Sequence, residues 1–273
     1  MREYLQDLYP VKEIDSLFCI LMETYCGIDR NHVLAGSRET INESELLLVY
    51  DAIKELATGK PIQYIIGSCH FYDLEIKVNA DVLIPRPETE ELVDIIIKQN
   101  KNRKNFRILD IGTGSGCIAI ATKKNLPDAE VYALELSETA LQIARQNASA
   151  HHVEITFVQM DILDKTQWSA LPDFDIIVSN PPYVMESEKA LMHKNVLNYE
   201  PHTALFVDDT NPLEFYKAIL QFAYSRMKPP KIYFEINENN AQDIIFLAEE
   251  NKITEICILK DFNSKERFAI LNY

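Results

Sequence analysis

The stretch Asn180-Pro181-Pro182-Tyr183 combines residue types that could hold an NH2 group, and it follows the apolar run FDIIVS directly. Pro181 keeps Asn180 out of the helical region of backbone conformations. Neither proline has an N–H group, so the chain cannot extend a strand ladder through them. The local carbonyls are therefore left free, and the Asn180 side chain adds another acceptor. Tyr183 offers a flat face for stacking.

Two neighbouring acceptors suit an NH2 group attached to a carbonyl or a heteroaromatic ring. Such a nitrogen is a poor nucleophile because its lone pair is delocalised. Acceptors that grip both hydrogens favour a pyramidal nitrogen and stabilise the positive charge that builds on it. The sequence therefore predicts that Asn180, Pro181 and Tyr183 are catalytic, and that these three residues with Pro182 hold the substrate. As an isolated tetrapeptide, the same stretch could be a plain turn.

A glycine cluster is the second candidate for a functional site. Three of the seven glycines stand in residues 112–116, Gly-Thr-Gly-Ser-Gly, directly after the apolar run FRILDI. Glycines permit positive φ and a close approach of the backbone to a ligand. A strand-to-helix turn in an open parallel sheet is where mononucleotides bind. The competing interpretation is a tight turn without a ligand.

The identity of the nucleotide depends on the pattern around this cluster. The dinucleotide fingerprint GxGxxG is met imperfectly because Cys117 follows Gly116, whereas GxGxG fits. Glu135 closes the next apolar run and could accept hydrogen bonds from both ribose hydroxyls, which suits NAD and S-adenosylmethionine equally. The run DIGTGSG resembles the first motif of S-adenosylmethionine-dependent methyltransferases, whose loop wraps an amino-acid tail and adenosine.

This resemblance implies a set of cofactor-binding residues. Asp161 would reach the adenine amine and Ile162 would lie near the ring. A neutral thioether is a good leaving group, so the transfer needs no metal ion. The six histidines also lack the spacing of metal ligands. The full set is Asp110, Gly112, Thr113, Gly114, Ser115, Gly116, Glu135, Asp161, Ile162 and Asn180.

Alternating apolar runs from Phe106 onward supply the elements that must position these residues. Alternation of strands and helices predicts a mostly parallel sheet that is covered on both faces. Ser137 and Pro212 stand where helices should begin. The expected strands are 106–112, 129–136, 153–161, 174–179, 231–236, 253–260 and 267–273. The expected helices are 115–126, 137–150, 212–227 and 241–250.

The first part of the chain has a helical pattern, and no strand is predicted before about residue 62. Asn42 followed by Glu45 predicts a capping box. Two β-rich runs on either side of residues 79–81 predict a hairpin, and Pro87 is expected to open a helix. The predicted organisation is a helical docking domain over 1–68, a β-hairpin linker over 69–85 and a catalytic domain over 86–273.

Composition narrows the function further. The net charge of −15 argues against a duplex nucleic-acid binder, which needs a basic footprint. The basic run at 98–107 is interpreted as a solvated loop. No apolar run is long enough to span a membrane, and the five scattered cysteines indicate neither a zinc site nor a disulfide framework. We expect a cytoplasmic monomer.

Several longer stretches resemble the release factor glutamine methyltransferases. They are GKPIQYIIG at 59–67, Phe71, VLIPRPETEELV at 82–93, LNYEPHTAL at 197–205 and Arg267. The chain departs from the usual family pattern at 207–216, VDDTNPLEFY, and at 234–237, FEIN, which the resemblance places at the rim of the substrate cleft and at one strand end. Arg86 and Glu90 match the family's RPxTE, but the resemblance gives them no clear role.

The resemblance implies a class I S-adenosylmethionine-dependent methyltransferase, with a seven-stranded mostly parallel sheet and a small helical N-terminal domain. S-adenosyl-L-methionine would be the cofactor. The implied acceptor is the side-chain amide nitrogen of the glutamine in the Gly-Gly-Gln motif of peptide chain release factors.

Three alternatives compete with this interpretation. An adenine-amine methyltransferase acting on DNA or RNA shares the NPPY motif, but it would need a basic face and a recognition domain. A methyltransferase-like binding module without activity would have little use for an intact glycine loop, Glu135 and NPPY together. An NAD-dependent oxidoreductase is disfavoured by Cys117 and by NPPY.

Overall fold

The computed structural model describes residues 1–36 and 39–273, which form two compact units. The helical unit consists of residues 1–68 and 192–199, and the sheet unit consists of residues 69–191 and 200–273. Within these described residues, we find no helix whose length and apolar character would let it cross a membrane.

The helical unit packs its helices around a small apolar core. This core includes Ile14 and Leu21 of α2 together with Ile53 of α4. The predicted capping box is confirmed, because the Asn42 side chain accepts from the Glu45 N–H and the Glu45 carboxylate accepts from the Asn42 N–H. The helices are α1 (Arg2–Leu5), α2 (Val11–Cys26), α3 (Arg30–Leu34), α4 (Glu43–Leu56), α5 (Ile62–Ile66) and α9 (Lys194–Tyr199).

A segment from later in the chain belongs to this unit. The Tyr199 hydroxyl, at the end of α9, donates a hydrogen bond to the carbonyl of Thr58 at 3.1 Å. The helical unit is therefore assembled from two stretches that are far apart in the sequence, which the pattern of the first 68 residues did not indicate.

The predicted hairpin exists, but its turn was placed wrongly. Strands β1 (Ser68–Phe71) and β2 (Leu74–Lys77) pair through a turn at Tyr72 and Asp73, which both have positive φ as tight hairpin turns require. Residues 79–81 instead form a local turn in which the Asn79 side chain accepts from the Asp81 N–H at 2.9 Å. Because neither turn residue is glycine or asparagine, the usual hairpin signal was missing.

The seven-stranded, mostly parallel sheet predicted from the sequence is confirmed. Its strand order is β10-β11-β9-β6-β3-β4-β5, and β11 is antiparallel to both of its neighbours. The strands are β3 (Phe106–Ile111), β4 (Ala129–Glu135), β5 (Thr156–Gln159), β6 (Ile176–Ser179), β9 (Lys231–Glu235), β10 (Glu255–Lys260) and β11 (Glu266–Asn272).

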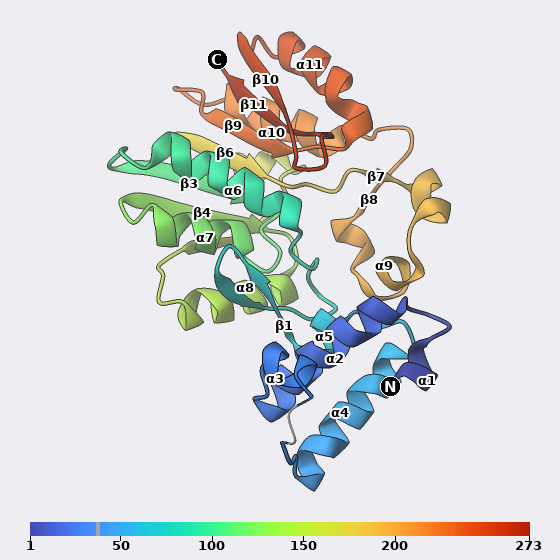
Figure 1. Ribbon diagram of the computed structural model, residues 1–273. Coiled ribbons are helices and arrows are strands. Elements are labelled where there is room, and N and C mark those ends of the chain that lie inside the picture. The colour runs from blue at the N-terminus through green and yellow to red at the C-terminus, as the bar shows by residue number, and fades with distance from the viewer. Residues whose placement is uncertain (37–38) are drawn as a thin grey trace. The chain divides into compact units, whose positions relative to one another are not determined.

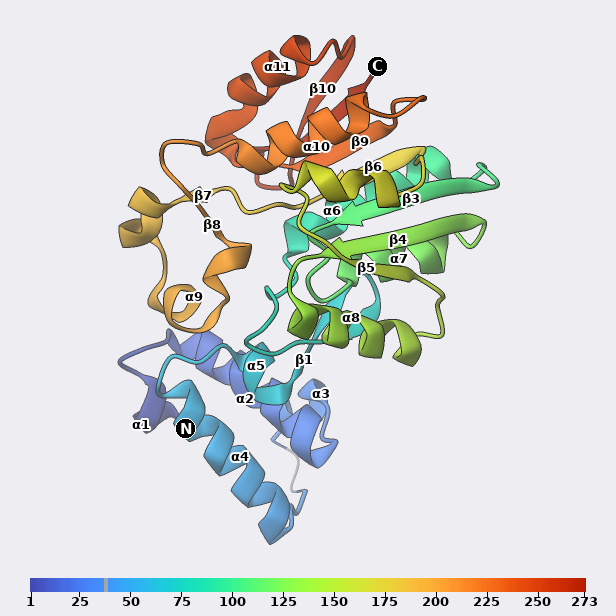
Figure 2. The ribbon, with the colours of Figure 1, turned by 180° about the vertical axis from the view of Figure 1, so that it is seen from behind.

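Helices cover both faces of this sheet. Helices α6 and α7 lie in front of it in Figure 1, and α10 lies in front of it in the opposite view of Figure 2. The predicted helix starts at Pro87 and after Ser137 are confirmed, whereas α10 begins two residues after Pro212. The helices are α6 (Pro87–Asn100), α7 (Cys117–Asn125), α8 (Glu138–Ala150), α10 (Glu214–Tyr224) and α11 (Ala241–Glu250).

The connection after β6 is less regular. It contains two short strands that pair with each other, β7 (Val184–Met185) and β8 (Phe206–Val207). The sheet unit also contains the 3-10 turns η1 (Lys165–Ala170), η2 (Glu186–Leu191), η3 (His202–Ala204) and η4 (Glu238–Asn240).

The strand order reverses direction at β3, which positions the functional residues. The chain continues from β3 to β4 and β5 on one side, and it returns to β6 on the other. Ile111 is paired with Ser179 in the register of β3 and β6. The glycine cluster and Asn180 therefore leave neighbouring strands at the same edge, which is where α/β sheets bind ligands.

Candidate functional site

A cavity of about 390 Å³ opens at the carboxyl ends of the strands. We refer to it as the carboxyl-end cavity. Its wall is formed by segments that follow β3, β4, β5 and β6, and by the stretch that precedes α6. Eight residues predicted from the sequence line it, namely Gly112, Gly114, Glu135, Asp161, Ile162, Asn180, Pro181 and Pro182.

The three glycines of the cluster have different structural roles. Gly112 and Gly114 line the cavity with φ of 73° and 55°, and an added Cβ would meet nothing within 4 Å at either position. Gly116 has φ of 82°, and its Cβ would lie only 3.1 Å from the Cβ of Ala144. The first two glycines therefore expose backbone to the cavity, whereas Gly116 lets α8 pack against the start of α7.

Asp110, Thr113 and Ser115 are buried and do not line the cavity, although the sequence grouped them with the cofactor-binding residues. Thr113 Oγ1 donates to Asp110 Oδ2 at 2.5 Å. Burial raises the pKa of Asp110 to about 7 despite this hydrogen bond, and its Oδ1 is buried without a partner among the described residues. The Ser115 carbonyl accepts from the Asn147 side chain at 2.9 Å. These buried residues stabilise the conformation of the glycine loop without lining the cavity.

Glu135 fastens the glycine loop to the end of β4. Its Oε2 accepts from the Gly114 N–H at 3.0 Å, and its Oε1 accepts from the N–H groups of Leu136 and Ser137 at 2.8 and 3.0 Å. A carboxylate offers about four acceptor positions, so roughly one is still open. Accepting from both hydroxyls of a ribose would therefore require release of the Gly114 N–H.

The far wall of the cavity comes from the end of β5. Asp161 Oδ1 accepts from the Leu163 N–H at 2.9 Å, and the Ile162 carbonyl accepts from the Trp168 indole N–H at 2.9 Å. Ile162 and Ile219 provide apolar surface in the same cavity. Glycine backbone, a carboxylate and an apolar wall in one cavity fit the amino-acid tail, ribose and adenine of S-adenosylmethionine.

Asn180 and Pro181 stand between two cavities. Besides the carboxyl-end cavity, they line a narrow cavity of about 40 Å³ together with Tyr183 and Arg86. We call this second cavity the side pocket. The backbone carbonyls of Asn180 and Pro181 accept no hydrogen bond from the part of the chain that the structure describes. These acceptors are therefore available where the two cavities meet.

The structure also assigns a position to Arg86, whose role the sequence did not reveal. Its Nη2 bonds both carboxylate oxygens of Glu200, at 2.7 and 2.8 Å, and the Ile84 N–H bonds the same carboxylate at 3.3 Å. The Glu200 side chain is 1% exposed. This pair fastens the segment before α6 to the loop at 201–204, and both segments line the carboxyl-end cavity.

Two further residues were missed by sequence reasoning. Thr89 Oγ1 donates to Glu235 Oε2 at 2.7 Å, and the Asn180 side-chain N–H donates to Thr89 Oγ1 at 3.3 Å. Burial raises the pKa of Glu235 to about 7, and burial also raises the pKa of Tyr183. Thr89 lies within RPxTE and Glu235 within the unusual FEIN stretch, but nothing in their spacing indicated that they meet.

Comparison with known proteins identifies relatives along the whole chain. The Methyltransferase small domain model matches residues 89–201, and the PrmC N-terminal domain model matches residues 2–67. The chain is 42% identical over 273 residues to the release factor glutamine methyltransferase of Flavobacterium psychrophilum, which covers 98% of this chain and 95% of that protein. The protein of the same name from Bacteroides thetaiotaomicron is 42% identical over 275 residues, covering 100% and 97%.

A solved structure supports the fold alone. The hMettl16 catalytic domain matches with a TM-score of 0.57 over 85% of this chain and 82% of that chain, at 14% identity. Together with the family models, this likeness confirms the fold class that was predicted from the sequence.

Proposed function

The chain belongs to the release factor glutamine methyltransferases, and on this basis we propose that it methylates the glutamine of the Gly-Gly-Gln motif in peptide chain release factors. The methyl donor is S-adenosyl-L-methionine, and the acceptor is the glutamine side-chain amide nitrogen. The observation that carries the proposal is the position of Asn180 and Pro181, which line both cavities and have free acceptors there.

The carboxyl-end cavity is proposed to hold the cofactor. The glycine loop and Glu135 would hold the polar parts, and Asp161 and Ile162 would face the adenine. When bound, S-adenosylmethionine supplies a methyl group on a sulfonium, so that a carbon–sulfur bond breaks as a carbon–nitrogen bond forms and the electron pair stays on a neutral thioether.

The side pocket is proposed to hold the glutamine. Asn180 Oδ1 and the Pro181 carbonyl would accept the two hydrogens of the amide, which stabilises positive charge as it develops on the nitrogen. Pro182 makes the segment rigid, and Tyr183 presents its ring to the planar amide. The methylated nitrogen is a strong acid, so water can remove its surplus proton and no dedicated base is needed.

The alternative acceptor, an adenine amine in DNA or RNA, has no specific support here. The relatives that match the whole chain are named for a protein substrate, and the net charge is −15. We propose that the protein forms no stable complex with nucleic acid and that it works as a cytoplasmic monomer.

A direct measurement tests the proposed reaction. The enzyme is incubated with methyl-labelled S-adenosylmethionine and a purified release factor, and the modified peptide is then located by mass spectrometry. We expect one methyl group on the glutamine of Gly-Gly-Gln, and a release factor with Gln→Ala at that position serves as the control. A label on any other residue, or on added DNA or RNA, contradicts the proposal.

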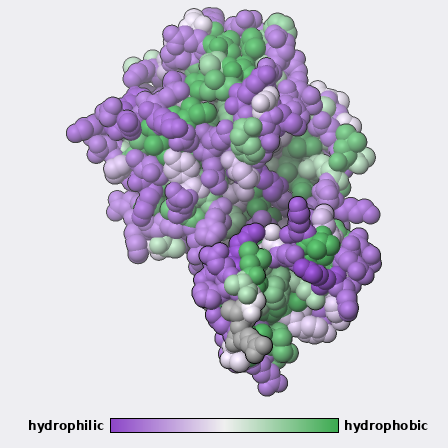
Figure 3. Space-filling view, in the orientation of Figure 1, coloured by the Kyte–Doolittle hydropathy of each residue, from purple (hydrophilic) through white to green (hydrophobic). Residues whose placement is uncertain are grey.

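The helical unit is proposed to dock the release factor. Three leucines on α4, Leu46, Leu47 and Leu48, are each more than half exposed, and Tyr50 is 41% exposed. Figure 3 shows apolar surface over this unit, at the bottom of the view. Exposed apolar patches rimmed by polar residues mark sites of protein interaction.

Point substitutions test docking better than deletion of residues 1–68, because deletion would remove the partners of Tyr199. Leu47→Glu should raise KM for an intact release factor several-fold and leave cofactor affinity unchanged. Glu43→Gln, at the start of the same helix, is the control. An unchanged KM in the Leu47 variant would remove α4 from the docking surface.

A further inference from the structure

Three buried or half-buried side chains form a hydrogen-bonded chain beneath the substrate acceptors. It begins at Glu235 at the end of β9, passes through Thr89 in the first turn of α6 and ends at Asn180 after β6. Thr89 is 2% exposed and Glu235 is 1% exposed.

The direction of the bonds along this chain is determined by hydrogen count. A threonine hydroxyl has one hydrogen to donate, and Thr89 donates it to Glu235 Oε2 at 2.7 Å. The Thr89 oxygen can then only accept from Asn180, so it must face the NH2 end of the Asn180 amide. The opposite end of that amide, Oδ1, is thereby left for the substrate.

The Asn180 amide would lose its function if it were turned over. Its NH2 group would then face the NH2 group of the substrate glutamine, and two donors cannot bond each other. Nothing in the shape of an amide distinguishes the two orientations, since oxygen and NH2 are nearly the same size. Only a neighbour that is restricted to accepting can select the productive one.

We infer that Thr89 and Glu235 are positioning residues, which lock the Asn180 amide with Oδ1 toward the methyl-accepting nitrogen. The inference rests on the proposed function, because it assigns the acceptor role to Asn180. Glu235 accepts the hydrogen of the Thr89 hydroxyl, so that the Thr89 oxygen can only accept from the Asn180 NH2 group. Neither residue touches the substrate.

The surroundings of Glu235 support this arrangement. The Tyr216 hydroxyl donates to the Glu235 backbone carbonyl at 2.9 Å, which holds the end of β9 in place. Arg267 and Arg86 favour the carboxylate form of Glu235, whereas Glu88 opposes it. The phenols of Tyr183 and Tyr216 also face Glu235, and burial raises the pKa of both. These are the titratable groups that any pH effect on this carboxylate must include.

Protonation of Glu235 should weaken the hydrogen bonds that hold the Asn180 amide in this orientation. A protonated carboxyl can donate to Thr89, whose own hydrogen could then turn toward Asn180 and favour the wrong orientation. Because burial raises the pKa of Glu235 to about 7, the transfer rate should fall as pH drops below about 7. Glu235→Gln does not titrate, so it should flatten this pH profile. Because its amide can either accept from Thr89 or donate to it, it should also lower the rate at pH 8 below that of the wild type.

The experiment compares two variants of Thr89. Thr89→Val keeps the shape of the side chain but loses the hydroxyl, and Thr89→Ser keeps the hydroxyl. Single-turnover rates are measured with saturating S-adenosylmethionine and release factor. We expect about a tenfold loss for Thr89→Val, which corresponds to one hydrogen bond of the usual strength, and less than about a twofold loss for Thr89→Ser. Cofactor affinity should not change in either variant.

A double-mutant comparison separates positioning from mere structure. In an Asn180→Ala background there is no amide to orient, so Thr89→Val should cost nothing further. An additional tenfold loss in that background would overturn the inference, as would a wild-type rate in Thr89→Val alone.

A spectroscopic readout works on the unmodified protein and does not depend on activity. In ¹⁵N-labelled protein, one Asn180 Nδ2 proton should be protected from solvent exchange, with the cross-peak assigned by its loss in Asn180→Ala. Rapid exchange of both protons would overturn the inference. If protection is seen but wild-type enzyme does not methylate a release factor, the proposed substrate fails and the orienting chain stands.

Discussion

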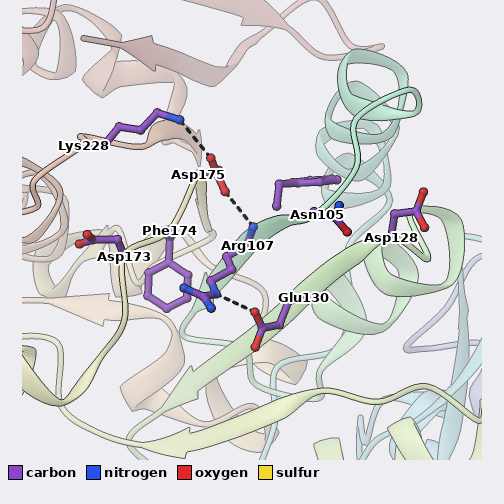
Figure 4. A pocket seen from close by; sticks show the side chains of 9 residues that line it. Asn105, Arg107, Asp128, Glu130, Asp173, Phe174, Asp175 and Lys228 are labelled. Carbon is purple, nitrogen blue, oxygen red and sulfur yellow. Dashed lines mark hydrogen bonds and ion pairs between the residues drawn. The ribbon is translucent and has the colours of Figure 1, made fainter.

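The two ends of the same sheet carry cavities of opposite character. The larger one, about 550 Å³, lies at the amino ends of the strands and is lined by residues such as Arg107, Glu130, Asp175 and Lys228. Figure 4 shows these charges paired, with Asp175 bonded to both Lys228 and the Arg107 N–H, and with Glu130 bonded to the Arg107 guanidinium. The carboxyl-end cavity is smaller, about 390 Å³, and it is lined by glycines, prolines and apolar residues.

The pKa values of the carboxylates are shifted in opposite directions at the two ends of the sheet. Burial raises the pKa of Asp110 and of Glu235 to about 7 at the carboxyl end. At the amino end, the bond from Arg107 lowers the pKa of Glu130. Burial would raise the pKa of Asp175, but the Arg107 N–H and the charges of Arg103 and Lys228 outweigh it and lower the pKa. This difference between the two cavities shows that the volume of a cavity does not by itself identify a functional site. Buried carboxylates with raised pKa values beside free hydrogen-bond acceptors are the better indication.

The largest effect should come from the carboxyl end. Asn180→Ala removes an acceptor that matters most as charge develops on the substrate nitrogen, so the loss should fall on kcat rather than on KM. We expect a decrease of roughly a hundredfold to a thousandfold, about 2.7–4 kcal/mol, in single-turnover rate. Asn180→Asp retains an acceptor and should keep part of the activity.

An Asn180→Ala enzyme that folds, binds S-adenosylmethionine and transfers methyl at nearly the wild-type rate would show that this asparagine only shapes a turn. The two ends of the sheet would then differ in their charges but not in function.

An intermediate effect concerns stability against pH. The folded-state pKa of Asp110 is raised from 3.8 to about 7, so the folded protein binds more protons than the unfolded chain between these values. Stability should therefore fall as pH rises from about 4 to about 7, with Asp110 contributing up to about 1.4 kcal/mol per pH unit. Asp110→Asn should flatten this slope in urea unfolding experiments. Glu235→Gln should flatten it further, because Glu235 has the same sign of shift.

If the Asp110→Asn protein shows the wild-type slope, then Asp110 is ionised in the fold and the proposed contrast with the amino end is wrong. The same experiment on Glu130→Gln provides the matched control, since the lowered pKa of Glu130 predicts a contribution to stability that is lost as pH falls.

The smallest effect should come from the amino end. Asp175→Asn weakens bonds to Arg103 and Lys228 but keeps an oxygen for the Arg107 N–H. We expect a stability loss of at most about 1 kcal/mol and an unchanged transfer rate. A large fall in the transfer rate would mean that the amino-end cavity takes part in the reaction, which would contradict a functional site at the carboxyl end alone.

The sequence predicted the sheet well because its signals were local. Buried runs such as FRILDI, the capping residue Ser137 and the glycine cluster each indicate an element without reference to distant residues. The hairpin turn at Tyr72 and Asp73 was missed because it contains no glycine or asparagine and because tyrosine rarely adopts positive φ.

The candidate site was predictable in part for a related reason. Gly112, Gly114 and Asn180 stand at strand ends, so the topology alone brings them together. The bonds from Thr89 to Glu235 and from Arg86 to Glu200 join residues 146 and 114 positions apart. Side-chain pairs at such separations follow from packing, and no pattern in a single sequence indicates them.

The place of β11 in the sheet has a consequence for the order in which the working enzyme is made. This strand comes last of the seven in the chain, yet it lies between β9 and β10 and pairs with both. As the ribosome releases the chain, β4, β5, β6 and β9 can each pair with a strand that is already present, whereas β10 has no neighbour until β11 emerges. Glu235 stands at the end of β9, where the register pairs it with Phe268. We expect a growing chain to form the cofactor cavity before β9 and Glu235 are held on both sides, so that methyl transfer reaches its full rate only when synthesis has reached the final strand of the sheet.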